Sequence, residues 1–432
     1  MNLLAQSMRS EGAESVIFFP RQYPNVKSNK EKCLQNGVDY IFWDDGDGVE
    51  KVVTSKIISH ILDLFSRFTI LKIRNEYKRI KIIRKKFKKL LLSHDINLIV
   101  LGGDIVGHDM AHYIQVGHKL GIRSVLAPQW FAGPKEPAET ISHLDCHKIT
   151  SILNRIFAFL NPEWRYSHFG IDLIRLPAWN ALVLCLFRVN PPNPWVLHSG
   201  YSDLILAESE AAKSYAISLG IPESKITVTG SICHDIISSS RLDFKESDGD
   251  LARTALCALP PNMFYDANPS RRAQFETYDE MINFWVQGLK KVFGDNFLIC
   301  IHPSSGNEVT DLLTTCNAPF TREGAVYLIA HFDVYIASIS ATIQWAIAKG
   351  IPVINYDVYR YNYPDYQGLD GVVTVFTKRA FMEAMMKISF DDKYYDYLRD
   401  KQSELSARWG LMDGAAHMRI YKTLKKYALQ NT

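Results

Sequence analysis

The sequence predicts an α/β protein made of two domains, each with a parallel β-sheet covered by helices. Short runs of Val, Ile, Leu and aromatic residues alternate with helical patterns along the whole chain. These runs are continuously apolar, which is typical of strands that are covered on both faces of a parallel sheet. The 432 residues exceed the size of one comfortable hydrophobic core, so two domains of about 150 to 250 residues each are expected.

Six apolar runs predict the strands of the first domain, which we place at residues 1–240. They are SVIFF, DYIFW, NLIVLGG, SVLAP, LILAES and ITVTG, in this order. Residues 135–195 have no strand pattern and are rich in Trp, Phe, Pro and His. This region is too long for a simple connection and predicts an insertion, which either covers a cleft or enlarges the domain with helices.

Five further runs predict the second domain at residues 250–410: TALCAL, FLICIH, VYIAS, PVINY and VVTVF. The segment SSSRLDFKESDGD, residues 238–250, is polar and lacks a periodic apolar pattern, so we expect it to be the linker. After the last strand, helical spacing broken near Gly410 and Gly414 predicts two helices. We expect the last of them, in residues 411–432, to pack back on the first domain.

The composition is that of an ordinary globular protein, with 47% hydrophobic and 22% charged residues. The N-terminus lacks the pattern of a secretory signal, and no apolar run is long enough to predict a membrane span. The seven cysteines are scattered and never spaced CxxC, which argues against a disulfide framework and a zinc site. We therefore expect a reducing cytoplasm.

A strongly basic stretch lies at residues 71–90, with ten Lys or Arg and one acidic residue. Apolar residues at three- and four-residue spacing predict an amphipathic helix. Its basic face is either a solvated helix surface or a surface attracted to an anionic membrane. The residues assigned to the second alternative are Lys78, Arg79, Arg84, Lys85 and Lys88. No nucleic-acid-binding module is visible, so nucleic acid is not an expected partner.

Ligands of parallel α/β sheets bind at the carboxyl ends of strands. Four polar segments follow predicted strands: WDDGDG at 43–48, GGDIVGHD at 102–109, IHPSSGN at 301–307 and ASISAT at 337–342. Two belong to each domain, so we expect them on the walls of a cleft between the domains.

The segment at 301–307 offers groups that suit an anion. His302 can donate a hydrogen bond from the strand end, and the residues after Pro303, which include Ser304 and Ser305, expose backbone N–H groups. A turn with a partly buried histidine is the alternative.

The segment at 337–342 places Ser338, Ser340 and Thr342 in front of a predicted helix. Ser340 or Thr342 suits the helix N-cap. A helix cap explains one hydroxyl, whereas a phosphate site explains all three.

The order of these segments resembles the nucleotide-binding half of GT-B glycosyltransferases: ALCALPPN, then FLICIHPSSGN, then VYIASISATIQWAIAKGIPVINYD. The segment DLILAESEAAKSYAISLGIPESKITVTGSICHD, residues 203–235, looks like the last unit of a GT-B N-terminal domain. The resemblance implies two Rossmann-like domains facing a central cleft, a nucleotide-sugar as co-substrate, and neither a cofactor nor a metal. The donor-binding residues that it implies are His302, Pro303, Ser304, Ser305, Ser338, Ser340, Thr342 and Gly230.

Three groups within that superfamily share part of the pattern. The HP and DDG motifs with the hydroxyl residues resemble bacterial sialyl- and polysialyltransferases. The stretch KGIPVINYDVYRYNYPDYQG resembles CDP-glycerol polymerising transferases, and LIVLGGD with AHYIQVGHKLGIRSVLAP resembles UDP-GlcNAc 2-epimerases.

Inverting sugar transfer needs a base for the acceptor hydroxyl and groups that stabilise the departing phosphate. The catalytic candidates of the first domain are Asp104, then Asp45 and Asp44, with His108 as an auxiliary group. Asp104 also suits a helix cap, and DDGDG also suits a plain acidic turn.

We expect a glycosyltransferase that uses a glycan or lipid-linked acceptor in bacterial surface polysaccharide (capsule or lipopolysaccharide) biosynthesis, in the cytoplasm or at the inner face of the membrane. The pathway is implied by the resemblance alone. The alternatives are a sugar-nucleotide epimerase or hydrolase, and a non-catalytic protein that binds a glycan or a nucleotide.

Overall fold

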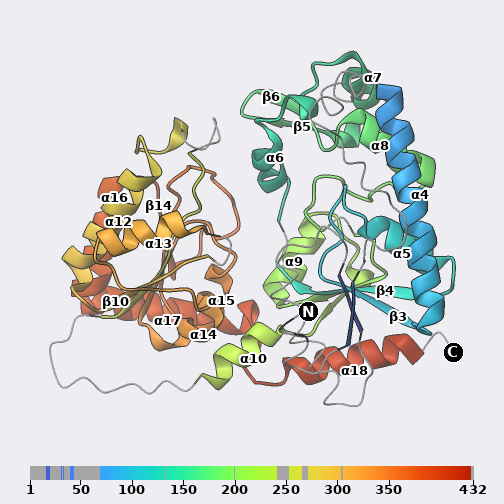
Figure 1. Cartoon of the computed structure of the whole chain (residues 1–432). Helices are drawn as coiled ribbons and strands as arrows, with labels where there is room; N and C mark the ends of the chain where they lie inside the picture. Colours follow the sequence, from blue (N-terminus) through green and yellow to red (C-terminus); the bar gives the residue numbers. More distant parts are fainter. Residues whose placement is uncertain are drawn as a thin grey trace.

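The computed structural model of the chain describes residues 16–19, 31, 33, 39–42, 69–130, 132–198, 200–240, 253–264, 271–302 and 305–429. These residues form two α/β domains that lie side by side (Figure 1). Most of the predicted linker, from residue 241 on, lies outside the described residues.

The first domain is built on a parallel sheet of four strands in the order β3-β4-β7-β8. Their bounds are Leu98–Leu101, Arg123–Gln129, Leu204–Ala207 and Ile226–Val228. Two further strands, β1 (Val16–Phe19) and β2 (Asp39–Phe42), pair in parallel with each other. The helices of this domain are α4 (Thr69–Ser93), α5 (Met110–His118), α9 (Glu210–Ser218) and α10 (Ile232–Ser239).

The predicted insertion contains the helices α6 (Lys135–Ile141), α7 (Ile152–Leu160) and α8 (Ala178–Phe187). The prediction that it has no strands is wrong, because β5 (Arg165–His168) and β6 (Ile171–Ile174) form an antiparallel hairpin. Phe169 and Gly170 form its two-residue turn, both with positive φ (45° and 76°), as the tightest hairpins require.

The second domain contains a parallel sheet of six strands in the order β11-β10-β9-β12-β13-β14. In chain order they are β9 (Ala255–Ala258), β10 (Phe297–Cys300), β11 (Phe320–Thr321), β12 (Val334–Ala337), β13 (Val353–Tyr356) and β14 (Val372–Val375). Its helices are α12 (Tyr278–Phe293), α13 (Asn307–Thr315), α14 (Ala325–Leu328), α15 (Ile343–Lys349), α16 (Lys378–Phe390) and α17 (Asp392–Trp409).

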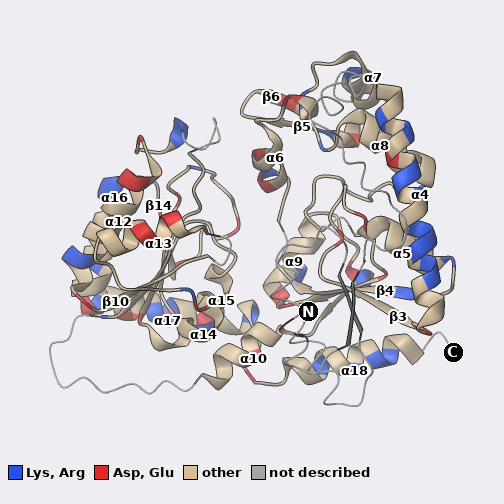
Figure 2. Ribbon diagram, in the orientation of Figure 1, with Lys and Arg blue, Asp and Glu red and all other residues tan. Residues whose placement is uncertain are grey.

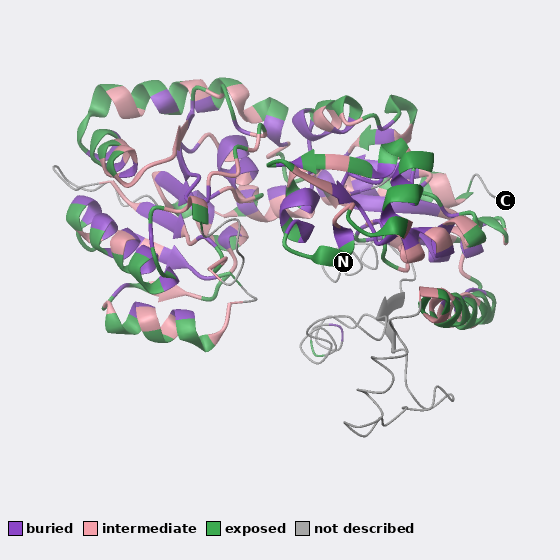
Figure 3. Ribbon diagram, turned by 90° about the horizontal axis from the view of Figure 1, so that it is seen from above, coloured by how far each residue is buried: buried purple, intermediate pink, exposed green. Residues whose placement is uncertain are grey.

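Both faces of this sheet are covered, as the continuous apolar runs predicted. Every residue of β12 and β13 is buried. Trp285 and Phe381 cover one face, and Ile343 and Ile347 cover the other. Figure 3 shows the same layering in both domains, with buried strands between helices whose outer sides are exposed.

The last helix, α18 (Ala416–Leu429), returns to the first domain (Figure 1). Its residues Ile420 and Leu424 pack against Val125 and Leu206 of the four-stranded sheet. The Asp235 carboxylate accepts hydrogen bonds from the first backbone N–H groups of α18, at 2.9 and 2.8 Å. None of the helices in the described part of the chain is long and apolar enough to cross a membrane.

Candidate functional site

The carboxyl ends of the second domain's strands lie at one edge of the sheet, because all six strands are parallel. Ala258 of β9 pairs with Cys300 of β10 on one side and with Ala337 of β12 on the other. The loop that contains His302 and the loop that begins at Ser338 therefore start level with each other, with β9 between them. The parallel sheet brings these two predicted segments to the same edge.

The loop after β12 has an unusual backbone at Ile339. Its φ of 43° lies in the left-handed region, which a β-branched residue rarely adopts. The Ile339 N–H donates to Oδ1 of buried Asn355 on β13, at 2.9 Å. A strained residue held by a neighbouring strand is a common feature of binding sites.

Two of the three predicted hydroxyls bond to each other. Oγ of Ser340 lies 2.7 Å from Oγ1 of Thr342, which is also hydrogen-bonded to the Tyr335 hydroxyl. Thr342 stands at the N-cap of α15 but makes no side-chain cap bond; instead its N–H donates to Oγ of Ser340 at 3.3 Å. The third hydroxyl residue, Ser338, is buried. These bonds connect Ser340 and Thr342 to each other and to Tyr335 of β12.

His302 is exposed at the sheet edge. Its carbonyl oxygen accepts from the Ser305 N–H at 2.9 Å, which closes a turn; Pro303 and Ser304 lie outside the described residues. Arg322 donates to the Ser305 carbonyl oxygen at 3.3 Å and so adds a cation to this loop. Sequence reasoning missed Arg322, although it directly follows the short edge strand β11.

In the first domain, Asp104 is fully buried. Its Oδ2 atom accepts from the backbone N–H of Ser202 at 3.2 Å and lies 3.4 Å from the Ser202 hydroxyl. Its Oδ1 atom lies 3.8 Å from Nδ1 of buried His198. Sequence reasoning missed both partners because they lie about a hundred residues further along the chain.

His108, in the same loop as Asp104, is exposed. The surrounding protein lowers its pKa below the usual value, and the nearby Arg175 cation lowers it further. A neutral imidazole with an exposed surface can accept a proton. The other two catalytic candidates, Asp44 and Asp45, lie outside the described residues.

Gly230, one of the predicted donor residues, lies against the C-terminal helix. Its φ is 80°, and a Cβ atom added to it would come within 2.9 Å of the Ala416 Cβ and 3.0 Å of the Arg419 Nη2. Close packing against α18 therefore accounts for the glycine at this position.

A buried carboxyl group links the domains at the end of β7. Glu208 is 5% exposed, and its Oε2 atom has no hydrogen-bond partner within the described part of the structure. Burial raises the pKa of Glu208 to about 7, although interactions with Ser231 and with Gln344 of α15 oppose the shift. In the sequence, Glu208 is marked only as a charged residue directly after a predicted buried strand.

A second link joins the insertion to the second domain. Arg272 Nη2 lies 2.5 Å from Oε1 of Glu139 on α6, and His168 Nε2 lies 2.7 Å from its Oε2. Burial raises the pKa of Glu139, but the bonds with His168 and Arg272 outweigh this effect and lower it below the ordinary value. The Arg272 Nε–H also donates to the Tyr359 carbonyl oxygen at 2.9 Å.

Aromatic rings add a third link between the domains. Trp130, which follows β4, stacks on Trp409 of α17 and on Tyr366, with ring centroids 5.2 and 6.4 Å apart. The Tyr366 hydroxyl donates to the Ser340 carbonyl oxygen at 3.1 Å. The stacked rings thus contact the loop that carries three of the predicted donor residues, Ser338, Ser340 and Thr342.

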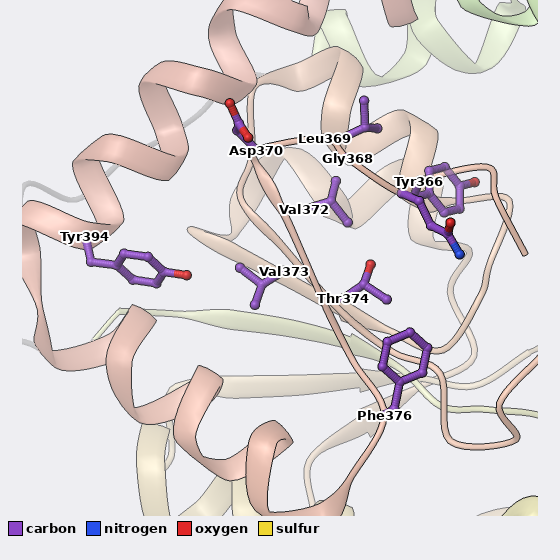
Figure 4. A pocket seen from close by; sticks show the side chains of 10 residues that line it. Tyr366, Gly368, Leu369, Asp370, Val372, Val373, Thr374, Phe376 and Tyr394 are labelled. Carbon is purple, nitrogen blue, oxygen red and sulfur yellow. The ribbon is translucent and has the colours of Figure 1, made fainter. Parts of the chain in front are cut away.

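A pocket of about 640 Å³ lies beside β14, the last strand of the sheet (Figure 4). Its walls are the segment from Tyr366 to Asp370, strand residues of β14, Phe376, and Tyr394 of α17. None of the predicted donor residues lines it. Within the described ranges, no group of three or more His, Cys, Asp or Glu side chains could hold a metal ion.

Lys and Arg residues recur along α4 (Figure 2). The five that were assigned to a membrane surface differ in their surroundings. Arg79 bonds to the carboxylates of Glu76 and Asp109, at 2.6 and 2.9 Å. Arg84 lies over the Phe187 ring, 5.1 Å from its centroid. The other three predicted membrane-surface residues, Lys78, Lys85 and Lys88, are exposed.

No family model matches the sequence, and no match is found among curated proteins. Solved structures do match the fold over nearly the whole chain. A UDP-GlcNAc 2-epimerase from Neisseria meningitidis, bound to UDP-GlcNAc, has 14% identity and a TM-score of 0.54, with 99% of this chain and 96% of that chain covered.

Two further structures give similar values. The S. aureus MnaA structure with UDP has 12% identity and a TM-score of 0.54, covering 100% of this chain and 93% of that one. The glycosyltransferase of kitacinnamycin has 12% identity and a TM-score of 0.51, covering 98% and 94%. The chain therefore has the GT-B fold of two Rossmann-like α/β domains, as the resemblance in its sequence implied.

Proposed function

We propose that this chain transfers a sugar from a nucleotide-activated donor to a glycan or lipid-linked acceptor. The observation that carries the proposal is the common sheet edge of the second domain, where the loops of His302 and Ser338 begin level with each other. Proteins of the same fold that bind UDP or UDP-GlcNAc add support. Surface polysaccharide assembly remains the proposed pathway.

The second domain is the proposed donor site. The side chain of His302, beside Arg322, would contact the donor phosphates. The loop of Ser338, Ser340 and Thr342, which Asn355 holds at Ile339, would contact the nucleotide on the other side of β9. These groups would stabilise the negative charge that develops on the leaving phosphate.

Among the catalytic candidates we assign the acceptor proton to His108. A base must reach the hydroxyl that it deprotonates, and His108 is exposed whereas Asp104 is enclosed by protein. Desolvation and the Arg175 cation lower its pKa, which favours the neutral imidazole that a base requires. Asp104 would then act as a positioning residue, which holds the loop through Ser202.

The donor assignment is tested by melting the full chain with CMP, CDP, UDP, GDP and their sugars. A nucleotide that binds only the folded chain adds about 2.7 kcal/mol of stability at a hundred times its Kd. We expect one base to raise the melting temperature and His302→Ala to abolish the rise. His331→Ala, which changes another exposed histidine of the same domain, should leave it intact.

Measurements of turnover distinguish the proposed glycosyltransferase from an epimerase or hydrolase and from a non-catalytic binding protein. Transfer to an acceptor that is lost in His108→Ala supports the proposal. Conversion of UDP-GlcNAc without an acceptor would instead indicate an epimerase or hydrolase, and tight nucleotide binding without turnover would indicate a binding protein. If no nucleotide changes the melting temperature, the donor site is wrongly assigned.

We further propose that the first domain contacts an anionic membrane surface. Exposed Lys78, Lys85 and Lys88 supply positive charge on α4, at about 1 kcal/mol for each basic residue near the surface. Helix α7 supplies exposed apolar side chains, with Ile152, Ile156, Phe159 and Leu160 at 77%, 53%, 84% and 69% exposure. Helix α8 packs against both helices, so the two features belong to one part of the domain.

Vesicle sedimentation tests this surface. We expect the chain to sediment with vesicles that contain phosphatidylglycerol, and Phe159→Ser or Lys85→Glu/Lys88→Glu to reduce binding. Phe390→Ser, which alters an apolar side chain that is 65% exposed in the second domain, is the matched control. Equal sedimentation with neutral and anionic vesicles would contradict the proposal.

A further inference from the structure

Arg175, directly after β6, is a buried cation in the insertion of the first domain. It is 8% exposed, and its Nε atom has no hydrogen-bond partner within the described part of the chain. Burial lowers its pKa to about 10, and no acidic group among the residues that the structure describes opposes this effect. Because a buried charge is costly unless it is paired, this position indicates an anion that completes it.

Two histidines lie beside Arg175. A Cβ atom on Gly107 would come within 2.7 Å of the Leu176 side chain, so the loop that contains His108 packs against the residue that follows Arg175. His147 is 9% exposed, and its Nδ1 atom lies 3.2 Å from the Ile174 carbonyl oxygen. The surrounding protein desolvates both rings and lowers their pKa values, and the Arg175 charge lowers them further.

The carboxylate of Asp109, which follows His108, already has a hydrogen-bond partner. The Asp109 carboxylate accepts hydrogen bonds from the Arg79 guanidinium, at 3.1 and 2.9 Å. It is therefore bound on the side of α4, and none of the acidic groups in the described residues raises the pKa of Arg175.

We propose that Arg175, together with His108 and His147, binds an oxyanion: a phosphate or carboxylate group of the acceptor. A guanidinium presents two parallel N–H groups that match both kinds of oxyanion. The His108 ring can add a donor from the loop. The Nδ1–H of His147 already donates to the Ile174 carbonyl oxygen, so this ring adds a donor through Nε2 in its protonated form, which a bound oxyanion would favour. The assignment of the oxyanion to an acceptor rests on the proposed function, since His108 is the proposed base and would lie beside a hydroxyl of the same molecule.

Calorimetry of the full chain with inorganic phosphate, pyrophosphate and glucuronate tests the site. We expect the wild type to bind at least one of them and Arg175→Met to weaken that binding at least tenfold. Arg175→Lys keeps the positive charge without the two parallel N–H groups, so it should bind more weakly than the wild type and more tightly than Arg175→Met. Arg165→Met is the control, because Arg165 is exposed and already pairs with Asp172 at 2.8 Å.

The preferred probe identifies the ligand: phosphate or pyrophosphate supports a phosphorylated acceptor, and glucuronate supports an acidic sugar. Equal affinities of the wild type and Arg175→Met, or no binding of any probe, would overturn the inference. If Arg175→Met does not fold, the same comparison is made with Arg175→Lys. The measurement needs no donor or turnover, so oxyanion binding without any nucleotide effect would refute the proposed function and leave this site standing.

Discussion

Replacing Glu208 by Gln should remove a pH-dependent cost from the folded chain. Burial raises the pKa of this carboxyl from 4.5 to about 7. Because the pKa is higher in the folded chain than in the unfolded chain, the folded chain binds more protons between these values. Its stability therefore falls as the pH rises from 4.5 to 7. A difference of one in pKa is worth about 1.4 kcal/mol, so the charged form costs about 3 kcal/mol above pH 7.

Urea unfolding of the wild type and Glu208→Gln at several pH values between 5 and 8.5 measures this cost. The two free energies of unfolding should be close at pH 5 and should differ by about 3 kcal/mol at pH 8, with the variant more stable. Glu163→Gln removes one exposed carboxylate and should show no such trend. A gap between wild type and Glu208→Gln that does not change with pH would refute the argument from burial.

Three further substitutions test the packing around the site by urea unfolding. Gly230→Ala should lower the free energy of unfolding by roughly 1–3 kcal/mol. The loss should exceed that of Gly220→Ala, because the φ of Gly220 is also positive but its added Cβ meets nothing within 4 Å. Equal losses would exclude a steric role of α18. Arg272→Met should lower the free energy of unfolding by about 3–5 kcal/mol, because the buried Glu139 carboxylate then keeps His168 but loses its Arg partner. A loss below about 1 kcal/mol would contradict a link between the domains. Asn355→Leu should lower the free energy of unfolding by about 1–3 kcal/mol, because the Ile339 N–H loses its acceptor. It should also weaken the nucleotide-dependent rise in melting temperature. An unchanged rise would show that this bond does not hold the donor loop.

Local sequence patterns were sufficient for most of the strands. A strand covered on both faces needs apolar side chains in both directions, so a continuous apolar run such as Val353–Tyr356 identifies itself without knowledge of the rest of the chain. The hairpin of β5 and β6 escaped because its turn begins with Phe169, a residue that rarely adopts positive φ. Its turn has no Asn or Asp before the glycine to mark it.

The sequence by itself determined which segments end at the sheet edge, because chain direction is the same in every strand of a parallel sheet. It thereby placed His302 and Ser338 at one edge. Only the tertiary structure decided which groups meet across the domains, such as Arg272 and Glu139, which are 133 residues apart in the chain. Periodicity reports whether a side chain faces protein or water, whereas its partner, and with it the pKa of a buried group such as Glu208, depends on how distant elements pack.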